Sequence, residues 1–159
     1  MTKSILLLGL LAMPFAVTAQ TNEQFADMND NIEMVRSMAA LERRAVITKN
    51  LQLSADESAG FWPLYDEYEA EKKRINDRLV KVITDYAGNY EDLSDELATS
   101  LIDDSLKVQS DLLKLRKKYL KKFRKVLAPK TVARFYQIEN KLDAVSDLTK
   151  ARGIPLVEG

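Results

Sequence analysis

Two stretches of the sequence carry apolar residues at alternating steps of four and three, and this spacing constrains the fold more than any other feature. Side chains with this spacing lie along one face of an α-helix, where they can pack against a second helix. The first row is Phe61, Tyr65, Tyr68, Ile75, Leu79, Val82 and Tyr86, with Lys72 as its one break. The second row is Leu101, Ser105, Val108, Leu112, Leu115, Tyr119, Lys122 and Val126. We therefore predict two long helices within residues 54–127, the first ending near residue 87 and the second covering residues 95–126.

The two long helices are predicted to fold back on each other as an antiparallel hairpin. The sequence from Gly88 to Asp92 is typical of a turn, and Ser94 can cap the second helix. Each arm of roughly 33 residues would be about 50 Å long. Arms of that length cannot be buried completely in a domain of this size, so exposed surface is expected, which favours binding over catalysis. A neighbouring row widens the apolar face of the second arm: Ile102, Leu106, Leu113, Leu120, Phe123 and Leu127.

Two shorter helices are predicted on either side of the hairpin, over residues 29–50 and 129–150. Ser54 and Glu57 fit a capping box before the first arm, and Pro129 suits the first position of the last helix. Pro63 removes one helical hydrogen bond, which predicts either a kink near Gly60 or a separate short turn over residues 55–60. The last helix should bury Val132, Phe135, Ile138, Leu142 and Val145. The fold class is therefore all-α, with one helical domain over residues 29–150 and a short apolar tail over residues 151–159.

The first 19 residues have the pattern of a secretory signal peptide. Lys3 supplies a positive charge, residues 5–17 are apolar, and small residues precede a cleavage site after Ala19. The apolar run of about 13 residues is short of the roughly 20 that span a bilayer, although an uncleaved membrane anchor is the alternative. Residues 20–28 are polar and predicted to be flexible. We expect an exported, periplasmic protein that is soluble after cleavage.

Two residue types are missing from the sequence, and their absence limits its chemistry. The chain has no cysteine, so it forms no disulfide, and no histidine, which is the commonest general base and metal ligand. Met34 and Met38 are four residues apart and could offer two thioethers to a soft metal, but no histidine or cysteine supports them. Neither a nucleophile–base arrangement nor a glycine-rich phosphate loop is found. We predict no enzymatic activity, no cofactor and no metal site.

A leucine followed by a helix start occurs twice, at Leu53-Ser54 and at Leu127-Ala128-Pro129. In its exported, all-helical context this feature resembles the Leu-Thr-x-x-Gln motif of the LTxxQ-type periplasmic stress proteins, the Spy/CpxP group. The first copy reads Leu53-Ser54-Ala55-Asp56-Glu57, in which Ser and Glu preserve the capping chemistry, whereas the copy at residues 127–131 lacks both the hydroxyl and the Gln. The resemblance covers residues 29–148. It implies a four-helix cradle that dimerises and either holds unfolded proteins without ATP or reports envelope stress to a membrane partner.

Residues 114–125 form the most basic segment of the sequence, with eight Lys or Arg in twelve positions. A turn near residue 90 would place them opposite residues 56–67, so they can form ion pairs with acids across the hairpin. Alternatively, a positive rim attracts acidic segments of a client, a partner or anionic lipid. Nucleic acid is not an expected partner of an exported protein. The lysines predicted to share one helix face are Lys114, Lys117, Lys118, Lys121 and Lys125.

The aromatic group Phe61, Trp62, Tyr65 and Tyr68 also has two interpretations. Helical spacing favours core packing, whereas Trp62 and Tyr65 would suit a contact surface with one dry and one wet side. Our first functional hypothesis is an ATP-independent chaperone for unfolded envelope proteins. The second is a sensor or inhibitor that docks on one membrane signalling protein, in an envelope-stress or sigma-factor pathway. A third, structural hypothesis predicts binding to peptidoglycan or lipid.

Overall fold

The computed structural model describes residue 34 and residues 36–157. The predicted signal peptide, the segment over residues 20–28 and the predicted start of the first helix lie outside these residues. The chain divides into two compact units, residues 1–44 and 45–159, and each is considered by itself. In the first unit, residues 36–44 are helical, and Met34, Met38 and Leu41 are exposed. All regular elements of the described residues are helical, which confirms the all-α class.

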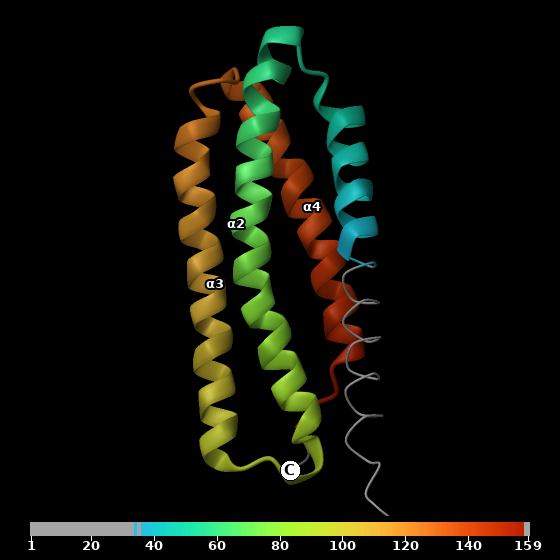
Figure 1. The fold of residues 1–159 in the computed structure, drawn as a ribbon, viewed down its shortest axis with the longest axis vertical. Coiled ribbons are helices and arrows are strands. Elements are labelled where there is room, and N and C mark those ends of the chain that lie inside the picture. Colours follow the sequence, from blue (N-terminus) through green and yellow to red (C-terminus); the bar gives the residue numbers. More distant parts are fainter. Residues whose placement is uncertain (1–33, 35, 158–159) are drawn as a thin grey trace, which may run out of the picture. The chain divides into compact units, whose positions relative to one another are not determined.

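The second unit contains the helical hairpin (Figure 1). The first helix ends at Leu51, and α2 (Ala55–Gly88) and α3 (Asp95–Phe123) then pack against each other as the two arms. A short 3-10 helix, η1 (Tyr90–Asp92), connects them, and α4 (Pro129–Gly153) runs alongside the pair. The arms are 34 and 29 residues long, so the hairpin is about 50 Å in length. The predicted hairpin is confirmed, whereas the dimer and the cradle stay predictions.

The helix starts follow the predicted capping chemistry. The backbone N–H of Glu57 donates to Ser54 Oγ at 3.2 Å, and the backbone N–H of Ser54 donates to Glu57 Oε2 at 3.2 Å, which completes the capping box. Ser94 caps α3 through a single bond, in which its Oγ accepts from the backbone N–H of Leu97 at 3.2 Å. Pro129 is the first residue of α4. Three helix starts are therefore confirmed at the residues that the sequence indicated.

One of the two alternatives for Pro63 is excluded, and the predicted end of the second arm was wrong. No separate turn over residues 55–60 exists, because α2 runs from Ala55 through Pro63 without interruption. Buried Phe61 and Tyr65 hold the helix in the core on both sides of the proline, and this packing outweighs the lost hydrogen bond. The second arm ends at Phe123 rather than at residue 126. The turn that follows it lies close to α2, since a Cβ on Gly60 would be 3.2 Å from Val126 Cβ.

Aromatic rings form the core of one half of the second unit, which we call the aromatic half. Phe61, Phe123 and Phe135 come from three different helices, and their ring centroids are 4.8–5.4 Å apart. Leu53 and Leu127, the leucines of the doubled motif, pack against this same cluster. The doubled motif therefore marks two chain segments that join one core. The buried members of the core are Ile47, Leu51, Phe61, Tyr65, Tyr68, Leu115, Tyr119, Phe123, Leu127, Val132 and Phe135.

The other half, around the hairpin turn, has a much thinner core, and we call it the tip half. No residue of α2 after Lys72 is buried, and no residue of α4 after Glu139 is buried. α3 contributes only Leu101 and Val108 as buried residues before Leu115. The same two arms therefore continue into a region that α4 covers poorly.

The side chains that α4 turns toward the hairpin explain this difference. Val132 and Phe135 are apolar, but the same helix face continues through charged residues at steps of four, four, four and three. These residues are Glu139, Asp143, Asp147 and Lys150. The prediction that Val145 points inward was wrong, because it is 66% exposed, whereas Asp143 contacts Lys72 of α2.

Candidate functional site

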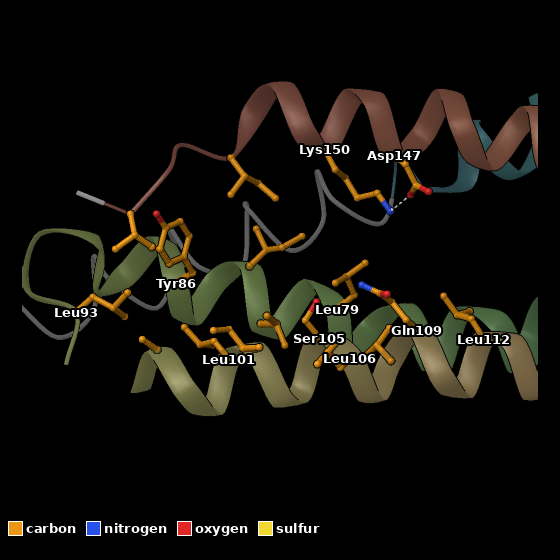
Figure 2. Close-up of a pocket in the computed structure, with 17 residues that line it drawn as sticks. Leu79, Tyr86, Leu93, Leu101, Ser105, Leu106, Gln109, Leu112, Asp147 and Lys150 are labelled. Atoms are coloured by element: carbon orange, nitrogen blue, oxygen red, sulfur yellow. Dashed lines mark ion pairs between the residues drawn. The ribbon is translucent and has the colours of Figure 1, made fainter. Parts of the chain in front are cut away.

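The tip half contains a groove of about 770 Å³, which we call the tip groove (Figure 2). Both arms supply apolar side chains to it, while α4 supplies Asp147 and Lys150, which form an ion pair at 2.7 Å. A volume of this size is in the range of sites that bind a small ligand or a short peptide segment. The apolar residues that line the groove are Leu79, Val82, Ile83, Leu93, Ala98, Leu101, Ile102, Leu106, Val108, Leu112, Ile154 and Val157.

Ile102 and Leu106 line the groove and are also among the large apolar residues that are exposed in the described part of the chain, at 61% and 56%. Leu113 follows on the same face of α3 and is 52% exposed. Lys117 and Lys121 continue this face at further steps of four, and both are exposed. We call these five residues the α3 stripe. The stripe is apolar where it borders the groove and cationic toward the aromatic half.

The C-terminal tail borders the groove at the hairpin turn. The hydroxyl of Tyr86 donates to the carbonyl of Pro155 at 3.0 Å, and the hydroxyl of Tyr90 donates to the carbonyl of Leu156 at 3.1 Å. Their two rings are in edge-to-face contact, with centroids 5.6 Å apart. Ile154 and Val157 also line the groove. Sequence analysis did not find this contact, because a hydrogen bond from a tyrosine to a backbone carbonyl leaves no pattern in the sequence.

The predicted basic segment divides into paired and unpaired lysines. Lys118 contacts Glu71 at 2.7 Å, Lys122 contacts Glu67 at 2.9 Å, and Lys114 contacts Asp111 at 3.2 Å. Lys117, Lys121 and Lys125 are exposed and have no ion pair with another described residue. The ion-pair interpretation is therefore confirmed for Lys118 and Lys122, whereas attraction of a partner by the other lysines stays a prediction.

The predicted pairing register across the hairpin was wrong. Lys118 and Lys122 meet Glu71 and Glu67 rather than residues near the start of α2, so the register is shifted by about two helical turns. The connection is also longer than a tight turn at residue 90. It contains η1 and an extended Leu93 before α3 begins.

The two aromatic residues predicted to contact a partner have different environments. Tyr65 is 3% exposed and lies in the core, where its ring is 6.0 Å from that of Phe135, so a partner cannot reach it in this conformation. Trp62 is half-buried, with its ring 5.0 Å from Phe61 and 5.6 Å from Tyr65. Core packing therefore describes Tyr65, whereas Trp62 keeps one side available for contact.

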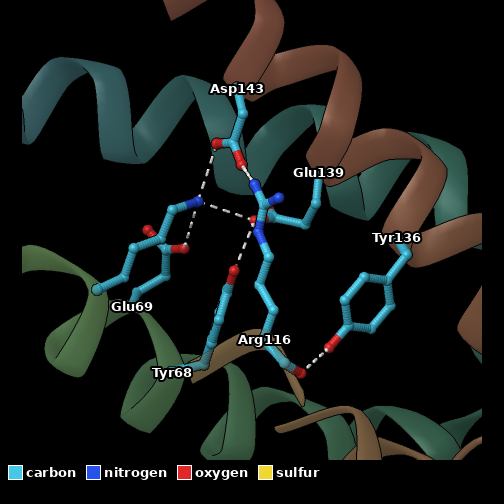
Figure 3. Close-up of polar contacts among 7 residues, drawn as sticks. Tyr68, Glu69, Arg116, Tyr136, Glu139 and Asp143 are labelled. Atoms are coloured by element: carbon cyan, nitrogen blue, oxygen red, sulfur yellow. Dashed lines mark hydrogen bonds and ion pairs between the residues drawn. The ribbon is translucent and has the colours of Figure 1, made fainter. Parts of the chain in front are cut away.

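A buried charged network that the sequence analysis missed connects α4 to both arms (Figure 3). Lys72 Nζ is 3.0 Å from Glu139 Oε2 and 3.0 Å from Asp143 Oδ1. Arg116 donates to the other carboxylate oxygen of Asp143, and the hydroxyl of Tyr136 donates to the backbone carbonyl of Arg116 at 2.8 Å. The signal was present in the sequence, because Lys72 is the one charged residue in the inward row of α2.

The network and its neighbours change the acidity of nearby groups. Burial raises the pKa of the Tyr68 hydroxyl, and the charges of Glu139 and Asp143 raise it further. Burial and a hydrogen bond to Glu71 likewise raise the pKa of Tyr119. Hydrogen bonds from Lys118 and Tyr119 lower the pKa of Glu71. The tyrosines therefore stay neutral, and Glu71 stays ionised, across the physiological range.

The described residues contain no group of three or more carboxylates arranged to hold a metal ion. None of their helices is long and apolar enough to cross a membrane. Comparison of the chain with models of known protein families, with curated proteins and with solved structures finds no match.

Proposed function

We propose that this protein is an ATP-independent, periplasmic chaperone that holds unfolded or partly folded envelope proteins. The observation that carries the proposal is the α3 stripe beside the tip groove. Exposed apolar side chains that border a groove of this size are typical of a binding surface rather than of ordinary protein surface. An unfolded protein exposes apolar segments that gain free energy when they leave water.

The cationic end of the stripe supports the same proposal. Lys117 and Lys121 have no acid among the described residues to neutralise them, so they can attract acidic segments of a client. Long-range attraction of this kind increases the rate of encounter more than the final affinity. A surface that combines apolar contacts with unpaired lysines suits many clients of different sequence. We therefore expect weak, broad binding without nucleotide.

The test is suppression of aggregation, measured by light scattering when a guanidinium-denatured enzyme is diluted into buffer. We expect the full chain to suppress scattering at about stoichiometric amounts, and absence of suppression at every ratio would contradict the proposal. The Ile102→Asp/Leu106→Asp variant should lose most of the effect. Asn140→Asp/Ala144→Asp is the matched control, because it adds the same two charges at exposed α4 positions outside both the groove lining and the α3 stripe.

Charge reversal tests the cationic end separately. Lys117→Glu/Lys121→Glu should weaken client binding several-fold at low salt and much less at high salt, because salt screens exposed charges. Lys130→Glu/Lys141→Glu is the matched control, since it reverses two exposed lysines of α4 that lie outside the α3 stripe. Equal affinities of the two variants would show that the cationic end is only solvated surface.

The alternative function, a sensor that docks on one membrane signalling protein, predicts a different binding pattern. Pull-down from envelope extract should then recover one saturable partner instead of many weak ones. The homodimer remains a separate prediction, and sedimentation of the full chain measures it directly.

A further inference from the structure

We propose that residues 154–157 are an intramolecular competitor for the tip groove, and that the ligand they exclude is an extended apolar segment of another protein. This inference rests on the proposed function and names the class of segment that the site accepts. Two observations carry it. The tail follows α4 as non-helical chain, and two tyrosines from the hairpin hold its backbone carbonyls at the groove.

The contacts of the tail indicate what kind of ligand fits. Tyr86 and Tyr90 bond to main-chain carbonyls, which every peptide has, so they select an extended backbone without selecting a sequence. Pro155 has no backbone N–H to donate, and none is needed, because the hydroxyls of Tyr86 and Tyr90 are the donors. Ile154 and Val157, on either side of the two bonded residues, line the apolar groove. The segment Ile154-Pro155-Leu156-Val157 therefore has the chemistry of the proposed ligand.

The tail is also held weakly enough to be displaced. Leu156 is 89% exposed and Val157 is 62% exposed, so the tail buries little apolar surface. Hydrogen bonds between exposed groups add little net stability, because water competes for the same donors and acceptors. A longer apolar segment would bury more surface in the groove than the tail does. A client segment can therefore replace the tail, whereas short or polar segments cannot.

The test measures binding of one peptide to two lengths of the protein. The probe is a fluorescein-labelled peptide with the sequence of residues 153–159, followed by fluorescence anisotropy. A chain that ends at Gly153 should bind the peptide at least tenfold more tightly than the full chain, because its groove has lost the tethered competitor. A chain that ends at Val157 is the matched control and should bind as weakly as the full chain.

Two further variants test the geometry. In the chain that ends at Gly153, Tyr86→Phe/Tyr90→Phe should weaken peptide binding about tenfold, since it removes both donors. In the full chain, Ile154→Ser should raise the affinity for the peptide in the same direction as truncation, but less. The proposal is overturned if truncation leaves the affinity unchanged, or if the truncated chain binds equally well without the two hydroxyls.

These outcomes are distinguishable from those of the proposed function. If truncation strengthens peptide binding but neither the full nor the truncated chain suppresses aggregation, the tail competes for the groove and the chaperone proposal fails. If the full and truncated chains suppress aggregation equally and the peptide binds neither, the chaperone proposal stands and the competitor is refuted.

Discussion

The aromatic half and the tip half are built from the same two helices, yet only one of them is well packed. In the aromatic half, α4 adds Val132 and Phe135 to a core of rings from both arms. In the tip half, the same face of α4 presents Asp147 and Lys150, and the arms keep a groove instead of a filled core. The comparison shows that the side chains of α4, and not those of the hairpin itself, determine which half is tightly packed and which half can accept a ligand.

The largest expected effect separates the two halves directly. Phe123→Ala should lower the free energy of unfolding by about 3–5 kcal/mol, because it leaves a cavity among Phe61 and Phe135. Leu106→Ala in the tip half should cost less than about 1 kcal/mol, since that side chain is already half exposed. Urea denaturation followed by circular dichroism measures both. Equal costs would contradict the division into a packed and an unpacked half.

The buried network at the border of the two halves gives the next effect. Lys72→Met should destabilise the protein by about 3 kcal/mol, because it leaves the 1%-exposed Glu139 without its ammonium partner. Lys72→Met/Glu139→Met should recover most of that loss, since both charges are then gone. Lys141→Met is the control on the exposed face of α4. A double variant no more stable than the single one would show that the two charges are not coupled.

One substitution in the segment between the first helix and α2 should stabilise the protein. Gln52 lies after the last residue of the first helix with a φ of 52°, a left-handed conformation that glycine adopts without steric cost. Gln52→Gly should raise the free energy of unfolding by about 0.5 kcal/mol. Gln137→Gly, within α4, should instead lower it by about 1 kcal/mol. Loss of stability in the Gln52 variant would refute this explanation.

The smallest effect concerns acid. The pKa of Glu71 in the folded protein is depressed below its ordinary value of 4.5, so its pairing with Lys118 stabilises the fold above pH 4.5. This contribution is lost as the pH falls below 4.5 toward the folded pKa. Glu71→Gln should therefore flatten the decline in stability below pH 4.5, by less than about 1 kcal/mol because the pair is exposed. Identical declines in the two proteins would remove the assignment.

The sequence predicted the hairpin and the helix starts because both depend on local patterns. The four-three spacing identified both arms, and the hydroxyls of Ser54 and Ser94 identified their first turns. These features require only neighbouring residues. They are therefore readable before any tertiary contact is known.

The tip groove was not predictable from the same patterns. The apolar row continues through Leu79 and Val82 as regularly as through Phe61 and Tyr65, so nothing in α2 indicates that packing ends. The difference arises on α4, where Asp143 faces the arms and Val145 faces away from them. Which residues of α4 face the arms depends on the angle at which the helices cross. Likewise, Lys72 broke the row visibly, but its partners in α4 could be identified only in three dimensions.

Hydrogen exchange of the full chain, measured with and without a denatured client, tests the central claim most directly. Amides of residues 79–112 should exchange faster than those of the aromatic half in the free protein, because few buried contacts protect them. Added client should slow exchange in residues 79–112 and leave the aromatic half unchanged. Slower exchange confined to the aromatic half, or no change at a client concentration that suppresses aggregation, would contradict the account.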